Sequence, residues 1–92
     1  MAGTVRATAL FSGYVQGVGF RFTTRRVAAG FAVTGYVRNL SSGEVEVVAE
    51  GTRPEIEAFL DTVRKAMGTC VSDVDVRWSA PTAEFSSFSV RL

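Results

Sequence analysis

Apolar and polar residues alternate with a period of two in five short stretches of the chain. These stretches cover residues 5–11, 33–39, 45–49, 74–78 and 88–90. This period is typical of β-strands that bury one face. Ser41-Ser42-Gly43 separates the second stretch from the third and predicts a turn, so we expect residues 33–50 to form a hairpin.

Two other stretches have the apolar spacing of helices. Residues 20–29 predict a helix whose inner face carries Phe20, Thr24 and Val27 and continues to Phe31, with Gly30 as its stop. The second helix ends at Gly68, and Thr52 and Glu55 predict a capping box at its start. Its apolar face is lined by Ile56, Phe59, Leu60, Val63 and Met67.

The predicted elements follow the order strand, helix, strand, strand, helix, strand, with a short extra strand at the end. This order is typical of an α+β fold, the ferredoxin-like βαββαβ sandwich, in which two helices pack on one face of a mostly antiparallel five-stranded sheet. We expect residues 1–92 to form a single domain with Trp78, Phe85 and Phe88 in its core.

This topology brings two distant segments together. A helix connects the first and second strands, so these strands should run parallel, with the third strand between them and antiparallel to both. Their carboxyl ends then lie at the same edge of the sheet. A glycine-rich segment follows the first strand and Asn39 ends the second, so the topology predicts a shared site.

The composition predicts a compact, soluble and cytoplasmic protein. Of the 92 residues, 47% are apolar and 21% charged, with a net charge of +1 and a single cysteine, Cys70. A general nucleic-acid or membrane-surface binder needs a large basic excess, and the basic residues are not interleaved with aromatic ones as on an RNA-binding sheet. The N-terminus lacks a signal-peptide pattern, and the longest uncharged run, residues 7–20, is too short and glycine-rich to span a membrane.

The chain contains no histidine, which excludes Ser-His and Cys-His nucleophile pairs and zinc sites built from imidazole. Glu44, Glu46 and Glu50 alternate along the predicted third strand. A metal site would need ligands from more than one element, so we interpret these glutamates as a solvated face or as ion-pair partners of neighbouring arginines. Any chemistry must then depend on arginine, amides, carboxylates or the backbone.

The segment from Gly13 to Arg21 has three glycines and no acidic residue. Gly17 and Gly19 allow positive φ, so their backbone N–H groups can form an anion-binding concavity at the start of the following helix. From these residues alone, an anion site and a simple strand-to-helix turn both stay open. Arg21 opposes the helix dipole, a mismatch typical of functional sites, although a solvated arginine would also fit. Asn39 alone is a typical turn former.

Three segments together resemble the motif of the acylphosphatases, small enzymes that hydrolyse carboxyl-phosphate anhydrides. They are Val15-Gln16-Gly17-Val18-Gly19-Phe20-Arg21, Gly35-Tyr36-Val37-Arg38-Asn39 and Gly43-Glu44-Val45-Glu46. The resemblance implies that Arg21 and Asn39 are catalytic, with Asn39 orienting the attacking water. It also implies that the substrate phosphate is held by Arg21 and by the loop backbone of Val15, Gln16, Gly17, Val18, Gly19 and Phe20.

By the same resemblance, an acyl phosphate would be converted to a carboxylate and inorganic phosphate by a monomer, without cofactor, metal or covalent intermediate. Tyr14 stands where the family commonly has a basic residue, and Ser42-Gly43 where Asp-Gly is common. Two other roles fit the same motif: a non-catalytic module that binds a phosphate or carboxylate metabolite, and the carbamoyl-phosphate domain of a larger maturation enzyme. The second would be accompanied by further domains.

Overall fold

All five predicted strands and both predicted helices form in the computed structural model, which describes residues 3–92. The strands are β1 (Thr4–Gly13), β2 (Thr34–Asn39), β3 (Val45–Thr52), β4 (Val71–Ser79) and β5 (Phe88–Val90). The helices are α1 (Phe20–Ala28) and α2 (Arg53–Met67), and a short 3₁₀ turn, Gly68–Cys70, connects α2 to β4. No helix among the described residues is long and apolar enough to cross a membrane.

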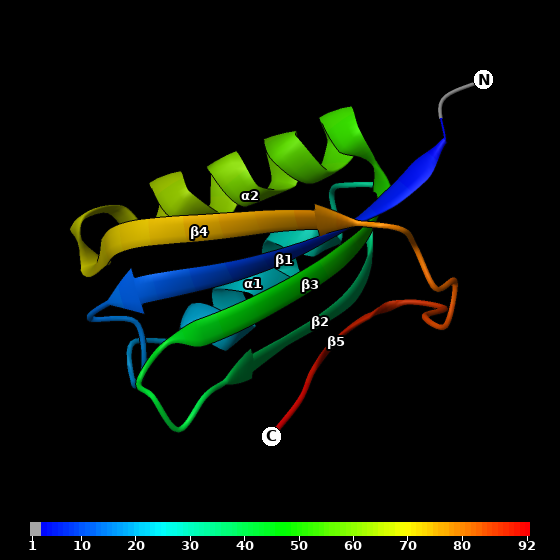
Figure 1. The fold of residues 1–92 in the computed structure, drawn as a ribbon. Helices are drawn as coiled ribbons and strands as arrows, with labels where there is room; N and C mark the ends of the chain where they lie inside the picture. The colour runs from blue at the N-terminus through cyan, green and yellow to red at the C-terminus, as the bar shows by residue number, and fades with distance from the viewer. Residues whose placement is uncertain (1–2) are drawn as a thin grey trace.

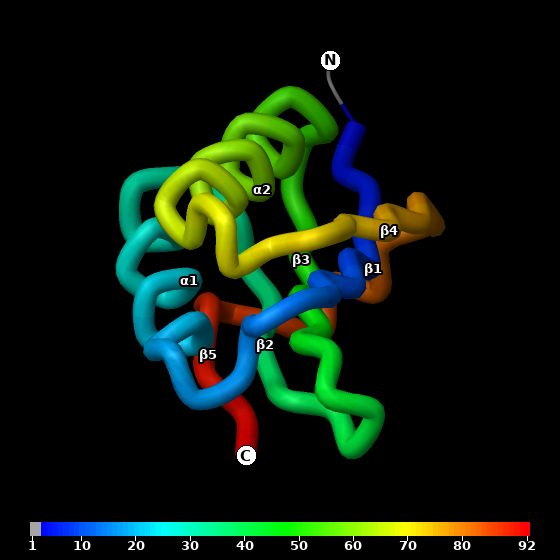
Figure 2. The backbone as a smooth tube through the Cα atoms, turned by 90° about the vertical axis from the view of Figure 1, so that its left-hand side faces the viewer, coloured from blue at the N-terminus to red at the C-terminus, as the bar shows by residue number. Residues whose placement is uncertain are grey.

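The five strands form one sheet in the order β4-β1-β3-β2-β5. β3 lies between β1 and β2 and is antiparallel to both, as predicted, whereas the edge strand β5 pairs with β2 in parallel. Both helices cover the same face of the sheet, and the other face carries no helix (Figures 1 and 2). The architecture is therefore the predicted ferredoxin-like α+β sandwich.

The core lies between the sheet and the two helices. Alternate residues of β1 and β3 point into it, including Phe11 and Val47, and α2 contributes Ile56 and Phe59, all fully buried. Aromatic contacts connect the layers, because the Phe59 ring packs edge-on against Phe88 of β5 with centroids 5.4 Å apart. Trp78 and Phe88 are partly buried against this core, as expected.

Phe85 does not join the core, so its sequence-based assignment is wrong. Its ring packs edge-on against Tyr36, with centroids 5.8 Å apart, and the guanidinium of Arg6 lies over it. Tyr36 lies between the buried residues Gly35 and Val37 of β2, so it points to the sheet face without helices. The connection from β4 to β5 therefore packs on this open face before β5 reaches the edge.

The predicted capping box is also absent. Thr52 is the N-cap residue of α2, but no side-chain hydrogen bond caps the helix. The Glu55 carboxylate instead accepts a hydrogen bond from the backbone N–H of Ala32 at 2.9 Å. Glu55 thus stabilises the connection between α1 and β2 rather than the start of its own helix.

Candidate active site

The glycine-rich segment forms a tight loop between β1 and α1. Gly17 and Gly19 both have a φ of 78°, a left-handed conformation that other residues disfavour. Val15 and Phe20 anchor the loop in the core, with only 1% and 2% of their surface exposed. The Phe20 ring packs edge-on against Phe11, with centroids 5.0 Å apart. The core therefore holds both ends of the loop, while its two glycines stay exposed.

The backbone N–H groups of this loop are available to a ligand. Within residues 3–92, no N–H group from Val15 to Phe20 donates a hydrogen bond to another part of the chain. Helix α1 begins after Gly19 without a side-chain cap and without an acidic residue in its first turn. Free N–H groups and the positive end of a helix dipole together form a typical binding site for phosphate or carboxylate groups.

The Gln16 side chain connects this loop to the β2–β3 hairpin. Its Nε2 donates hydrogen bonds to the carbonyl oxygen of Leu40 at 2.7 Å and to that of Glu44 at 2.9 Å. Leu40 directly follows Asn39, the last residue of β2. Gln16 therefore fixes the loop relative to Asn39, whereas the sequence predicted a role only for the backbone of Gln16.

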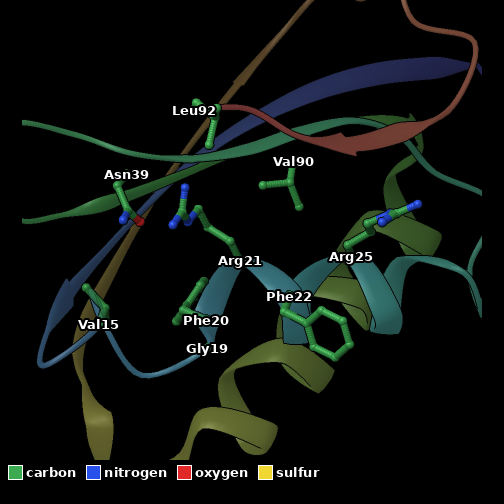
Figure 3. Close-up of a pocket in the computed structure, with 10 residues that line it drawn as sticks. Val15, Gly19, Phe20, Arg21, Phe22, Arg25, Asn39, Val90 and Leu92 are labelled. Carbon is green, nitrogen blue, oxygen red and sulfur yellow. The ribbon is translucent and has the colours of Figure 1, made fainter.

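Arg21 and Asn39 line the same cavity, as the topology predicted. Arg21 lies in the first turn of α1 and Asn39 at the end of β2, and both are half-buried. Figure 3 shows the Arg21 side chain extending from the helix toward Asn39. The cavity has a volume of about 300 Å³. It brings together one arginine and one amide that are distant in the sequence.

Most of the predicted phosphate-binding residues also line this cavity: Val15, Gly17, Gly19, Phe20 and Arg21. Gln16 and Val18 are not among its lining residues. The side chain of Gln16 bonds to the hairpin, and Val18 is half-buried against the core. These two side chains therefore attach the loop to the hairpin and to the core.

Four lining residues were not predicted. Phe22 and Arg25 come from α1, and Val90 and Leu92 come from the C-terminal segment. Arg25 lies one helical turn after Arg21, so the helical spacing alone was sufficient to find it. Val90 reaches the site because β5 pairs with β2, where Val90 is opposite Val37. The sequence of β5 contains no signal that predicts this pairing.

The electrostatics of the cavity suit an anion. Its lining side chains include two arginines and no acidic residue. The β3 glutamates point to the other face, where Glu46 pairs with Arg38 and Glu50 pairs with Arg6, each with an Nε–Oε distance of 2.7 Å. These pairs confirm the predicted ion-pair role for Glu46 and Glu50, whereas Glu44 precedes β3 and accepts a hydrogen bond from the Ser12 hydroxyl at 3.2 Å. Within residues 3–92, no carboxylate forms a salt bridge with Arg21.

Comparisons with known proteins find relatives over almost the whole chain. A family model described as acylphosphatase matches residues 7–90. An acylphosphatase from Salinibacter ruber is 45% identical over 87 residues, which cover 94% of this chain and 92% of the relative. The crystal structure of acylphosphatase from Bacillus subtilis has a TM-score of 0.87 and 29% identity, covering 96% of this chain and 99% of that one. Full-length HypF, in its phosphate- and nucleotide-bound form, matches 100% of this chain with 12% of its own, at a TM-score of 0.87 and 26% identity.

Proposed function

This chain belongs to the acylphosphatase family of acylphosphate hydrolases, and we propose that its catalytic site consists of the glycine-rich loop, Arg21 and Asn39. One observation supports this site above all: Arg21 and Asn39 line one cavity with the loop at the uncapped start of α1. We place the substrate phosphate in this cavity and take inorganic phosphate and a carboxylate as the products.

The phosphoryl group is held by two kinds of donor. The free N–H groups of residues 15–20 bind its oxygens from the loop. The guanidinium of Arg21 provides a planar fork of donors that matches two phosphate oxygens. Because no carboxylate of residues 3–92 pairs with Arg21, its charge is available to the negative charge of the transition state.

Asn39 orients the attacking water. The water oxygen forms a bond to phosphorus while the bond between phosphorus and the bridging oxygen breaks. The bridging oxygen leaves with its electron pair as part of the carboxylate, and the proton of the water passes to the phosphate product or to solvent. Since Asn39 approaches from β2 and Arg21 from α1 (Figure 3), the two residues hold water and phosphoryl group in a defined relative position.

The leaving group explains how a site without histidine can be sufficient. A carboxylate is a weak base, so it departs without being protonated, and the loose transition state of phosphoryl transfer needs little help from a general base. Positioning and charge stabilisation therefore provide the catalysis, without metal or covalent intermediate.

The test is hydrolysis of acetyl phosphate and benzoyl phosphate in the presence of a chelator. Arg21→Gln and Asn39→Ala should each lower kcat by a factor of about 10² or more, as expected when a transition-state donor is removed. Binding of inorganic phosphate, measured as protection against thermal unfolding, should be lost in Arg21→Gln and kept in Asn39→Ala. Arg64→Gln, at an exposed position of α2, is the matched control.

Activity that disappears with the chelator would contradict the proposal, as would activity that survives both substitutions. Phosphate protection without turnover of any acyl phosphate would indicate a binding module instead.

A further inference from the structure

Exposed apolar side chains gather around the cavity that holds Arg21 and Asn39. Within residues 3–92, the large apolar side chains that are exposed belong to Tyr14, Phe22, Val90 and Leu92. The last three line this cavity, and we call them the apolar rim. Single exposed apolar residues are normal on a protein surface, but a cluster beside a polar cavity is typical of a ligand site.

The rim is formed by two elements. Phe22 belongs to α1 and is 65% exposed, whereas Val90 and Leu92 belong to the C-terminal segment and are 37% and 108% exposed. Figure 3 shows Val90 and Leu92 on the β5 side of Arg21 and Phe22 on the helix side. In an empty site these side chains remain in contact with water, so covering them with an apolar group is favourable.

The position of the phosphate determines where the rest of the substrate lies. If the loop N–H groups and Arg21 hold the phosphoryl oxygens, the acyl group extends from the bridging oxygen out of the loop. Apart from Asn39, the cavity walls beyond the loop and Arg21 are the rim residues and Arg25. We propose, on the basis of the function proposed above, that the apolar rim binds the acyl group and selects acyl phosphates with an alkyl or aryl group larger than acetyl.

Arg25 also lines the cavity, and its positive charge would favour an acyl phosphate that carries a second negative charge on its acyl group. Its side chain is exposed, and its guanidinium points away from Asn39 (Figure 3). The cavity wall beside this arginine carries the three apolar side chains of the rim. The balance of contacts therefore favours an uncharged acyl group.

The experiment compares kcat/KM for benzoyl, butyryl, succinyl and acetyl phosphate. The protein should prefer benzoyl and butyryl phosphate to acetyl phosphate, because each buried methylene adds favourable transfer free energy. Phe22→Ser and Val90→Thr should each lower the benzoyl-to-acetyl ratio by a factor of about three to ten. Tyr14→Ser is the matched control, because Tyr14 is 76% exposed but does not line the cavity, and it should leave the ratio unchanged.

Val90→Thr keeps a β-branched residue in the short edge strand, and Phe22→Ser changes an exposed helix position. Circular dichroism establishes that each variant is folded, and either variant alone is sufficient for the test. A ratio unchanged in the folded rim variants would overturn the inference and leave the proposed function intact. A preference for succinyl over butyryl phosphate that Arg25→Gln abolishes would also overturn it. Failure to hydrolyse any of the four substrates would overturn the inference together with the proposed function.

Discussion

The Nε2 of Gln16 lies 2.7 Å from the carbonyl oxygen of Leu40, and this hydrogen bond joins the glycine-rich loop to the strand end that carries Asn39. The same nitrogen also donates to the Glu44 carbonyl oxygen at 2.9 Å. A single amide thus sets the distance between the two halves of the site. A leucine at this position would have no hydrogen-bond donor. A glutamate would place a negatively charged carboxylate against the two carbonyl oxygens.

Gln16→Leu should therefore lower kcat more than it weakens phosphate binding. The substitution leaves the loop N–H groups in place but removes the link that positions them relative to Asn39, and we expect a loss of about tenfold or more in kcat. Steady-state kinetics with benzoyl phosphate and phosphate protection in thermal unfolding separate the two effects. Thr62→Ala, which removes a hydrogen bond on the exposed side of α2, is the control. Equal losses in kcat and in phosphate affinity would contradict a positioning role.

Gly19→Ala should destabilise the protein and weaken phosphate binding without any steric clash. Gly19 has a φ of 78°, and a Cβ built there meets nothing within 4 Å. The cost is therefore that of the left-handed backbone, about 1 kcal/mol. Chemical denaturation gives the stability, and titration with inorganic phosphate gives the affinity. Gly30→Ala is the comparison, because its Cβ would make an ordinary contact of 3.5 Å with the Val27 carbonyl oxygen. A fully stable Gly19→Ala protein would show that the loop tolerates another conformation.

Arg21→Lys should restore little of the activity lost in Arg21→Gln. A lysine keeps the positive charge but loses the planar fork that binds two phosphate oxygens at once, so we expect kcat to fall by about tenfold or more. The measurement is kcat/KM for acetyl phosphate at several salt concentrations. An Arg21→Lys enzyme with nearly normal kcat would indicate that charge alone is required. Arg64→Lys on α2 is a matched control.

Stability should fall in acid because of Glu50. This side chain is 5% exposed, and burial alone would raise its pKa. Hydrogen bonds from Thr82, Arg6 and the Ala83 backbone outweigh that effect, so the pKa of Glu50 lies below its ordinary value. A group with a lowered folded pKa stabilises the protein fully above its unfolded pKa of about 4.3, and this stabilisation is lost as the pH falls through the folded pKa. The free energy of unfolding should therefore decline below about pH 4.

Glu50→Gln should destabilise the protein at neutral pH by about 2 kcal/mol, because the amide cannot satisfy the half-buried Arg6 and the two backbone N–H groups as a carboxylate does. It should also flatten the acid side of the pH–stability curve. Urea denaturation at pH 3 to 7 measures both effects. Glu57→Gln is the control, since Glu57 is exposed and lies 3.8 Å from Arg53. An unchanged acid profile in Glu50→Gln would assign the acid sensitivity to other carboxylates.

Periodicity predicted the elements because most of their buried faces are regular. Apolar residues alternate in β1 and recur at helical spacing in α2 because each element buries only one of its faces in the core. The meeting of Arg21 and Asn39 followed from topology, since a helix between two strands makes them parallel and places their ends together. Their assignment as a catalytic pair depends on the family motif.

The missed features lack such a local signal. The partners of Gln16 are carbonyl groups 24 and 28 residues away, and no periodicity marks them. Phe85 was assigned to the core because an aromatic residue usually lies there, but the Glu50 carboxylate binds the backbone of Thr82 and Ala83 and holds this connection on the open face. Glu55 was assigned to its own helix because a capping box is a local pattern, whereas its actual partner, Ala32, belongs to another connection.

The parallel pairing of β5 with β2 also brings into one site residues that are synthesised at different times. The loop and Arg21 come from the first quarter of the chain, whereas Val90 and Leu92 are among its last residues. A growing chain therefore contains all the groups proposed to bind phosphate long before the apolar rim is complete. The part of the site that would bind the common phosphate group is made early together with Phe22, and Val90 and Leu92, which would help to distinguish one acyl group from another, are added much later.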